Sequence, residues 1–295
     1  MNKMIRMAVF LLVIVLASSL VLFSCSDSAR ESGAASDAGE DGSADDVHLN
    51  VYFFNAGKAD AIALTTENHT VIIDAGEKGF GSTVLDYLSA EQREAVDYLV
   101  ITHFDKDHVG GAAKIINSVP VSNVLQSNSV KESDEYEKYT EALESSGISP
   151  VTVRDSLTFE LDGVVFTVDP PAQEEYENDP SNNSSLILTV ECGARRLLFT
   201  GDAENDRMAE YISKGLAVDC DLMKVPHHGR WDKNLSELVL MTAPEYAVIT
   251  SSDSEPEDEK TVALLEECGV ETFYTRIAPV IVTCDGENLS IQYDN

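Results

Sequence analysis

The chain has 295 residues, enough for one large domain or two small ones, and its 43% apolar content can fill a sizeable core. It carries 52 Asp and Glu side chains against 20 Lys and Arg, a net charge of −32. Because contacts from Lys and Arg supply most of the affinity for a nucleic-acid backbone, this balance argues against tight, sequence-independent nucleic-acid binding.

Residues 1–24 have the features of an export signal. Two basic residues precede an uncharged apolar run, 7–23, which is rather short for a membrane span. The run ends at Leu22-Phe23-Ser24-Cys25, which resembles a bacterial lipobox with cleavage before Cys25 and lipid attached to its thiol. The alternative is an uncleaved N-terminal anchor. Either way we expect the folded part outside the cytoplasm, as a membrane-anchored lipoprotein of the cell envelope or as a secreted protein.

Residues 25–46 are expected to form a disordered acidic tether. They consist mainly of Ser, Gly, Ala, Asp and Glu and contain no aromatic side chain, so they cannot bury enough apolar surface to become ordered. The folded domain is therefore predicted to span residues 47–295. The four cysteines of this domain lie in apolar or strand-like stretches without the paired spacing of a zinc knuckle, which favours buried free thiols. They are Cys192, Cys220, Cys268 and Cys284.

The folded part is predicted to open with a meander of strands that leads to a buried core strand. Strands are expected at 48–54, 61–64, 70–73 and 98–102, and helices at 82–90, where Ser82 can act as the N-cap, and from 112 onward. The second half begins after a polar helix at 133–145. Its predicted strands are 157–161, 164–168, 186–191, 195–199, 222–225, 246–250, 280–284 and 289–293, and its helices are 205–214, 235–241 and 262–268. Stretches rich in strands followed by helices, twice over, predict two sheets packed face to face with helices outside.

The segment after the core strand contains four metal-ligand side chains within six positions. They are His103, Asp105, Asp107 and His108, and Gly110-Gly111 follow them. Imidazole and carboxylate groups on a tight loop can hold one or two divalent ions, and a bound metal lowers the pKa of water to about 7. We expect the two glycines to let the backbone turn sharply beside this site.

This segment, His-x-Asp-x-Asp-His-x-Gly-Gly, resembles the metal-binding signature of the metallo-β-lactamase superfamily, in the variant found in the hydrolase domain of ComEC/Rec2-type competence proteins. The resemblance implies an αββα sandwich, two mixed sheets flanked by helices, and a centre that holds two divalent metal ions, Zn²⁺ or Mn²⁺. Most of the superfamily has His where this chain has Asp105.

Three further carboxylates match positions of the family. Asp60 lies in Asn-Ala-Gly-Lys-Ala-Asp-Ala, which is similar to the family's Asp-Val-Gly-Gln-Gly-Asp-Ala, although a plain hairpin is an equal alternative. Asp74 ends an apolar strand and is expected to orient a ligand imidazole or the loop backbone, or simply to cap the turn. Asp202 follows a buried strand in Thr-Gly-Asp, and the resemblance makes it the carboxylate that bridges two metals.

The Asn182-Asn183-Ser184-Ser185 segment is similar to the family's Asn-Asn-x-Ser, near which most superfamily members carry a metal-binding His. This chain has none, so a neutral oxygen or water is expected at one metal position, which suits Mn²⁺ better than an imidazole-rich site would. Asn183 and Ser185 are candidates for substrate contacts, or they form only the turn before the next strand.

The second strong motif is Lys224-Val225-Pro226-His227-His228-Gly229. Adjacent histidines at a strand end should point in different directions, so we expect His228 to bind metal and His227 to act as the acid/base group or to contact phosphate. Lys224 and Arg230 are candidate substrate contacts, although Arg230 could simply offset the acidic surface. Arg230-Trp231 and, further on, Glu255-Pro256 depart from the family pattern, which has Ser and His-Pro there.

The metal ligands predict a metal-dependent hydrolase that acts through a metal-bound hydroxide. The resemblance makes phosphodiester or phosphoester bonds the leading substrate class, because the families that the chain resembles include nucleases and phosphocholine esterases. His103 and Asp105 are expected to hold one ion, and Asp107, His108 and His228 the other, with Asp202 between them. Asp107 or His227 is expected to handle the proton. The alternatives are hydrolysis of a lactone, thioester or lactam bond, or a non-catalytic envelope protein that keeps the fold. The predicted partners are the substrate and, through Cys25, a membrane.

Overall fold

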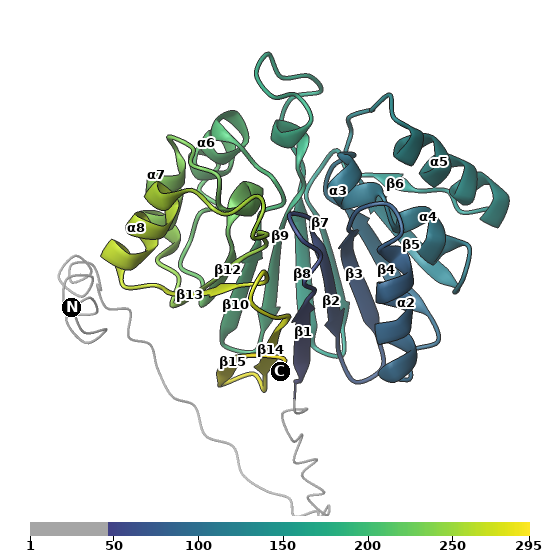
Figure 1. Cartoon of the computed structure of the whole chain (residues 1–295), viewed down its shortest axis with the longest axis horizontal. Coiled ribbons are helices and arrows are strands. Elements are labelled where there is room, and N and C mark those ends of the chain that lie inside the picture. The colour runs from purple at the N-terminus through teal and green to yellow at the C-terminus, as the bar shows by residue number, and fades with distance from the viewer. Residues whose placement is uncertain (1–46) are drawn as a thin grey trace, which may run out of the picture. The chain divides into compact units, whose positions relative to one another are not determined.

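The computed structural model describes residues 47–295, which form two β-sheets packed face to face with helices on both outer faces (Figure 1). The predicted signal peptide and tether lie outside the described residues. The αββα sandwich of two mixed sheets is confirmed. Within the described part of the chain, no helix has the length and apolar character needed to cross a membrane.

The first sheet has eight strands in the order β15-β14-β1-β2-β3-β4-β5-β6. Pairing is antiparallel from β15 to β3 and parallel from β3 to β6. The bounds of its strands are β1 Leu49–Phe53, β2 Ala61–Thr65, β3 Thr70–Ala75, β4 Val96–Ile101, β5 Val121–Gln126, β6 Val151–Thr152, β14 Val280–Cys284 and β15 Leu289–Tyr293.

The second sheet has seven strands in the order β13-β12-β11-β10-β9-β8-β7. It is antiparallel from β7 to β10 and parallel from β10 to β13. The bounds of its strands are β7 Leu157–Leu161, β8 Val164–Asp169, β9 Ile187–Cys192, β10 Arg195–Phe199, β11 Leu222–Lys224, β12 Tyr246–Ile249 and β13 Glu271–Tyr274.

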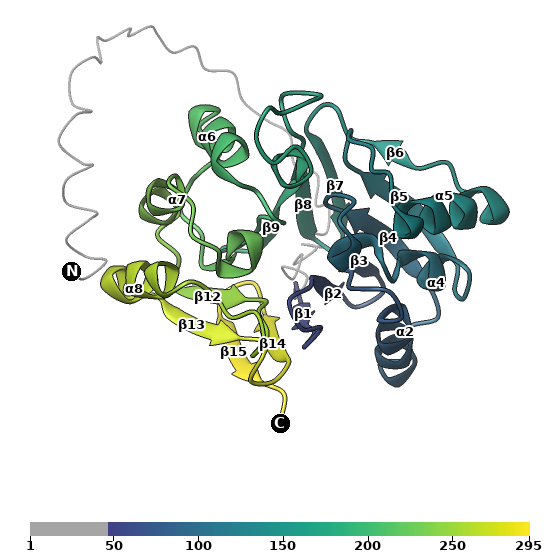
Figure 2. The same ribbon diagram turned by 45° about the horizontal axis from the view of Figure 1, so that its top comes forward.

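The helices separate into two groups, one on each outer face, as the turned view in Figure 2 shows. The first sheet carries α2 Gly81–Ala90, α3 Lys106–Val109, α4 Ala112–Ile116 and α5 Asp134–Ser146. The second carries α6 Asn205–Ser213, α7 Leu235–Thr242 and α8 Glu259–Cys268. Two short 3₁₀ turns, η1 Asn182–Ser184 and η2 Pro226–Gly229, lie in motif segments.

The central core lies between the two sheets and is filled by the apolar side chains that each sheet turns inward. Phe53 of the first sheet stacks on Phe199 of the second with ring centroids 5.9 Å apart. Alternation along each strand fills this layer from both sides, while the other faces of the sheets bury the helices. The central layer therefore makes the two sheets one rigid scaffold for the loops at their ends.

Three strands, β5, β6 and β13, were not predicted from the sequence. In β5 the polar pair Ser122-Asn123 interrupts the apolar run, so the residues show no clean alternation. β6 has only two residues, and β13 is a half-exposed strand at the edge of its sheet. The expected cap of α2 is also wrong: the helix begins at Gly81 with Phe80 at the N-cap, and Ser82 lies inside it.

Candidate metal centre

The motif segments follow the carboxyl ends of parallel strands in both sheets, β3 and β4 in the first and β10 and β11 in the second. His103 follows β4, Asp202 follows β10, and His228 follows β11. Asp74 lies near the end of β3, the neighbour of β4. Because parallel strands end at the same edge of a sheet, side chains far apart in sequence are brought together there, which is where ligands commonly bind in α/β proteins.

Five side chains form a buried cluster at this edge. Its members are His103, Asp107, His108, Asp202 and His228. In it, Asp202 Oδ2 lies 3.2 Å from His108 Nε2 and 3.1 Å from His228 Nε2. His228 Nε2 also lies 3.6 Å from Asp107 Oδ2. The ligand atoms fall into two overlapping groups of three that could each hold a metal ion: one comprises His103, His108 and Asp202, the other Asp107, His108 and His228.

Four inward-facing atoms of the cluster make no hydrogen bond of favourable geometry within the described structure, although two of them lie within 3.2 Å of Asp202 Oδ2. They are the Nε2 atoms of His103, His108 and His228 and Oδ1 of Asp202. A buried polar atom without a partner costs about 1–3 kcal/mol, so four of them converging on one place are unfavourable unless something binds there. Imidazole nitrogens and carboxylate oxygens are ligands for Zn²⁺, Mn²⁺ and related divalent ions. The cluster therefore fits divalent metal.

The outward-facing nitrogens of two imidazoles are held by other groups. His108 Nδ1 lies 2.8 Å from Asp74 Oδ2, and Asp74 also accepts hydrogen bonds from the backbone N–H and hydroxyl of Thr102. His228 Nδ1 lies 2.8 Å from the carbonyl oxygen of Thr250. Both contacts favour a proton on Nδ1, which leaves Nε2 free to coordinate. Asp74 thus lies where the resemblance implies an orienting carboxylate.

Charges in the cluster shift its pKa values in both directions. Burial lowers the pKa of His103 to about 4, helped by neighbouring His108, so this imidazole is neutral at pH 7. Burial also opposes the charged form of His108, but Asp202 and Asp74 outweigh it and raise the pKa of His108 well above its usual value. Burial opposes ionisation of Asp202, yet His108, His228 and Lys224 hold its pKa well below the usual range. The carboxylate is therefore available as a negatively charged ligand.

Gly110 and Gly111 have a different role from the predicted one. Their φ angles are −59° and −89°, ordinary values for any residue, so the loop needs no glycine for its turn. What it needs is space: a Cβ on Gly111 would collide with the carbonyl oxygen of Ala75 and lie 2.6 Å from the backbone nitrogen of Gly81. The glycines let the metal loop pack directly on β3 and α2.

Gly111→Ala is expected to lower the free energy of unfolding by about 3 kcal/mol, because backbone atoms of two elements must move to make room. Urea denaturation followed by circular dichroism measures this change. Asn117→Ala, at an exposed site just after α4, is the matched control and should change stability by less than about 0.5 kcal/mol. Equal stability of the Gly111 variant and the wild type would contradict this packing argument.

Asp105, a predicted ligand, lies outside the buried cluster. Its Oδ1 accepts a hydrogen bond from Lys131 Nζ at 2.6 Å and another from the Ser181 hydroxyl. It does not belong to any of the ligand groups found in the described residues. The loop after β5 supplies Lys131, so this carboxylate pairs with a lysine 26 residues further along the chain.

Lys224 does not lie where a substrate contact would be. Its side chain is fully buried, and its Nζ is 2.5 Å from Asp60 Oδ2, 2.9 Å from the carbonyl oxygen of Gly201 and 3.5 Å from Asp202 Oδ1. Asp60 in turn accepts a hydrogen bond from the Thr250 hydroxyl at 2.6 Å. The predicted substrate role of Lys224 is therefore corrected: the lysine and Asp60 form a buried ion pair behind the cluster.

Asn183 and Ser185 are also buried, which favours the structural one of the two predicted roles. The side-chain carbonyl of Asn183 accepts from the backbone N–H of Arg207, and its amide donates to the carbonyl of Asn178. Ser185 Oγ accepts from the backbone N–H of Asp202 at 3.2 Å and lies 3.4 Å from His103 Nδ1. Both residues hold the backbone in place beside the cluster. Neither lines the cavity that opens on the solvent side of the cluster.

His227 and His228 point to different partners, as predicted. Both backbones are left-handed, with φ of 47° and 53°, an unfavourable conformation for non-glycine residues. His228 faces the cluster, whereas His227 Nδ1 lies 3.0 Å from Glu204 Oε1, and Asp232 completes a second, partly buried His/carboxylate group there. Arg230 extends to the surface, where its guanidinium lies 3.9 Å from Glu255. Only His227 of these surface-side residues lines the adjoining cavity.

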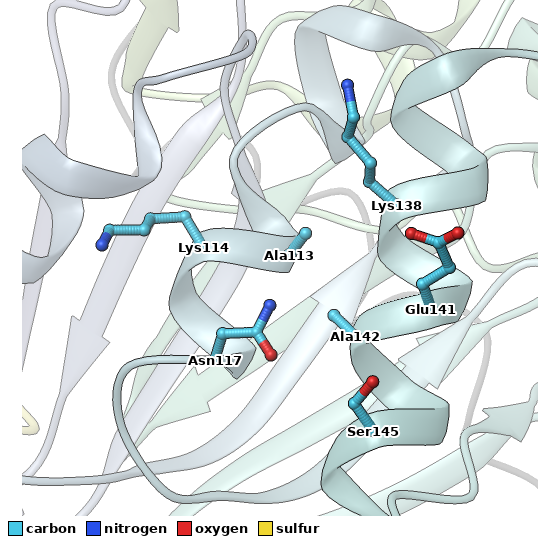
Figure 3. A pocket seen from close by; sticks show the side chains of 7 residues that line it. All are labelled: Ala113, Lys114, Asn117, Lys138, Glu141, Ala142 and Ser145. Atoms are coloured by element: carbon cyan, nitrogen blue, oxygen red, sulfur yellow. The ribbon is translucent and has the colours of Figure 1, made fainter.

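A cavity of about 350 Å³ opens beside the cluster. Lys58, Lys106 and Lys131 contribute three ammonium groups to its wall, in a chain with 20 basic residues among 295. The remaining wall residues are Asp105, Asp107, Ser133, Glu135, Asn182, Asp202 and His227. A second hollow lies between α4 and α5, where Figure 3 shows Lys114 and Lys138 with Glu141, and it contains no histidine. The candidate ligands therefore adjoin only the first of these two hollows.

Sequence reasoning missed Glu204 and the lysines of the cavity. Glu204 could have been found, because it follows Asp202 by two residues in the Gly-Asp-Ala-Glu segment. Lys58 stood out only as a departure from the family's Gln, and here its Nζ lies 3.3 Å from Asp107 Oδ2. Nothing local marks Lys131, which reaches the cavity because of the path of the chain after β5.

Comparison with known proteins agrees with this geometry. The model of the metallo-beta-lactamase superfamily matches residues 55–251. ComE operon protein 3 of Bacillus subtilis is 27% identical over 176 residues, which are 60% of this chain and 22% of that protein. Recombination protein 2 of Haemophilus influenzae is 25% identical over 206 residues, 68% of this chain and 24% of that protein. The chain thus spans about a quarter of the length of these curated relatives.

Solved structures show the same fold. The metallo-beta-lactamase fold protein YhfI from Bacillus subtilis superposes with a TM-score of 0.55 at 9% identity, covering 84% of this chain and all of that one. CmlA, a diiron beta-hydroxylase from Streptomyces venezuelae, gives a TM-score of 0.51 at 16% identity, covering 82% of this chain and 55% of that one. With the family match over 55–251, these findings show that the chain belongs to the metallo-beta-lactamase superfamily and resembles the ComEC/Rec2-type competence proteins within it.

Proposed function

We propose that this protein is a metal-dependent hydrolase of phosphodiester or phosphoester bonds with a two-metal centre. The observation that carries the proposal is the combination of unpartnered metal-ligand atoms with three lysines around one cavity. Four carboxylates line the same cavity, and two of them pair with Lys58 and Lys131. Bound divalent ions, together with Lys106, would supply the positive charge that attracts an anionic substrate to this otherwise strongly acidic chain. Membership of a superfamily whose members are generally metal-dependent hydrolases agrees with this reading.

Two overlapping sets of residues would hold the ions, as Zn²⁺ or Mn²⁺. Asp107, His108 and His228 form one set, and His103, His108 and Asp202 form the other, so His108 is common to both. Asp105 would join His103 only after leaving Lys131. When bound, such ions lower the pKa of water and polarise phosphoryl oxygens. The diiron centre named for CmlA supports a two-metal reading for this fold.

The chain's own side chains would bind the substrate and move the proton. The lysines can contact phosphoryl oxygens, since their ammonium groups are flexible point charges. His227 lines the same cavity and is held by Glu204, so it is placed to give a proton to the leaving oxygen. Asp107 is the other candidate for handling a proton. Burial opposes its ionisation, but His228 and His108 hold the pKa of this carboxyl far below its usual range, so it stays charged and is only a weak base, which suits a metal ligand better than a proton carrier.

Lys106 gives the sharpest test of the cavity, because no contact in the described structure pairs its ammonium with a cluster residue. We expect Lys106→Ala to raise KM for bis-p-nitrophenyl phosphate about 3–10-fold with kcat within twofold, the effect of one screened charge. Lys114→Ala, in the hollow between α4 and α5, is the matched control and should leave KM unchanged. The difference should shrink in 0.5 M salt. A KM equal to the control's would contradict substrate binding in this cavity.

A substrate panel tests the reaction class. The full chain reloaded with Mn²⁺ or Zn²⁺ is expected to hydrolyse bis-p-nitrophenyl phosphate and to leave a thioester, a lactone and a β-lactam largely intact. Turnover of one of those three without phosphodiester turnover would replace the proposal by that reaction. Bound metal with no turnover of any substrate would favour an envelope protein that binds its ligand without catalysis.

Location and membrane attachment belong to the same proposal. The sequence supports export with a lipid on Cys25, which would tether the domain to the cell envelope through residues 25–46. Incorporation of labelled palmitate into the wild type and its loss in Cys25→Ala would support this attachment. Equal labelling of both proteins would contradict it.

A further inference from the structure

Two buried cysteines meet at the end of the sandwich away from the candidate metal centre. Cys192 ends β9 of the seven-stranded sheet, and Cys284 ends β14 of the eight-stranded sheet. The turn after Cys192 leads into β10, whose opposite end leads to Asp202. The pair therefore lies between the two sheets, one strand length from the candidate ligands. It plays no part in the proposed hydrolysis.

The two side chains are in mutual contact. Cys284 Sγ lies 3.6 Å from the carbonyl oxygen of Cys192, and Cys192 Sγ lies 3.9 Å from the carbonyl oxygen of Cys284. Both residues are buried, with exposed fractions of 0% and 3%. These reciprocal contacts bring each sulfur atom within 4 Å of the other cysteine's backbone.

The turns that follow the cysteines are locked to one another, which holds this arrangement. The backbone N–H of Ala194 donates to the carbonyl oxygen of Gly286 at 2.7 Å, and Arg195 Nε donates to the carbonyl oxygen of Glu287 at 2.6 Å. A Cβ on Gly193 would collide with Gly286. Since neither turn can move away from the other, the cysteines stay adjacent as long as the sheets are folded.

The chemistry of the pair is asymmetric. The hydrogen bond from Cys192 lowers the pKa of the Cys284 thiol to about 7, against the opposing effect of burial, and the backbone N–H of Gly286 adds to it at 3.4 Å. The same pairing raises the pKa of Cys192. A thiolate is the reactive form in thiol–disulfide exchange, so Cys284 is suited to react first and Cys192 to complete the bond.

We propose that Cys192 and Cys284 form a disulfide that links the two sheets when the chain folds in an oxidising thiol–disulfide buffer. With oxidised glutathione as the oxidant, the Cys284 thiolate attacks one glutathione sulfur and releases one glutathione thiolate. Deprotonated Cys192 then attacks the Cys284 sulfur and releases the second glutathione. Two protein thiols lose two electrons, one glutathione disulfide becomes two thiols, and these take up the two protons.

The test refolds the full chain in a mixture of oxidised and reduced glutathione, and in parallel under dithiothreitol. Unreduced peptide mapping by mass spectrometry should give one dominant linked pair containing Cys192 and Cys284, and a denatured thiol titration should count two thiols fewer than in the reduced sample. The oxidised chain should melt about 5–10 °C higher, because the link closes a long loop in the unfolded state.

Matched variants separate the pair from the other cysteines. Cys220→Ala, also at a buried cysteine, should keep the linked peptide and the difference in melting temperature between oxidised and reduced samples, whereas Cys284→Ala should lose both. If Cys284→Ala fails to fold, the two wild-type samples still decide the matter. Absence of the linked peptide from the oxidised wild type, or linkage spread over Cys220 and Cys268, would overturn the proposal.

Discussion

Asp202→Asn should reduce kcat/KM for bis-p-nitrophenyl phosphate by about 10³-fold or more. Asp202 Oδ2 lies within 3.2 Å of Nε2 of both His108 and His228, so this carboxylate belongs to one candidate ligand set and also contacts a histidine of the other. An amide of the same shape removes its negative charge, and stabilisation by a metal centre is worth several kcal/mol, each 1.36 kcal/mol being a factor of ten in rate.

Initial-rate kinetics with saturating Mn²⁺ measure this loss, and metal analysis of the same sample shows whether an ion has gone. Asp206→Asn, a partly exposed site in the first turn of α6, is the matched control and should stay within twofold of the wild type. Circular dichroism checks that both variants are folded. Activity of the Asp202 variant within about threefold of the wild type would rule this carboxylate out of the centre.

Lys224→Met should lower the free energy of unfolding by about 3–5 kcal/mol, since it leaves the buried carboxylate of Asp60 without its cation. The lysine is fully buried, lies 2.5 Å from Asp60 Oδ2, and donates to the carbonyl of Gly201. Burial alone would lower the pKa of Lys224, but the carboxylate of Asp60 raises it, so the pair is charged on both sides.

Urea denaturation measures the change, with Lys114→Met at an exposed site as the control, expected within about 0.5 kcal/mol of the wild type. The double variant Asp60→Asn with Lys224→Met should recover part of the loss, because it leaves no unpaired charge. If Lys224 instead contacted substrate, as its position beside the His-His motif had indicated, the single variant would keep its stability and raise KM.

The parts of the site that could be predicted are those in which several ligand types are close neighbours in sequence. His103 and His108 are five positions apart and follow one strand, so a local pattern is enough to bring them together. The His227-His228 pair was similarly recognisable, and adjacency in sequence was enough to predict that the two side chains diverge. In the structure, left-handed backbone at both residues turns them to different partners.

What could not be predicted depends on contacts between distant segments. Asp105 has the right chemistry for a ligand but pairs with Lys131, which reaches it because of the path of the chain after β5, a strand with no clear alternation. Lys224 lies on the three-residue strand β11, too short for a pattern to reveal that all three side chains are buried. Which face a short strand presents is decided by its neighbours in the sheet.

The same limit applies to the cysteines. The expected burial is confirmed for three of the four cysteines, whereas Cys268, at the end of α8, is exposed. The contact between Cys192 and Cys284 connects the two sheets across 92 positions of sequence, so no local sequence pattern predicts it. Fold class was easier to predict, because many strands and helices each contribute a weak periodic pattern in the same direction.

The most direct test of the metal centre is to strip the full chain with EDTA, reload it with Mn²⁺ or Zn²⁺, and measure metal content and phosphodiester turnover on the same sample. We expect two exchangeable ions per chain, turnover that appears only on reloading, and loss of at least one ion in His228→Ala. A stripped chain that binds no Mn²⁺ or Zn²⁺ at micromolar concentration, or turnover that persists unchanged in EDTA, would contradict the account.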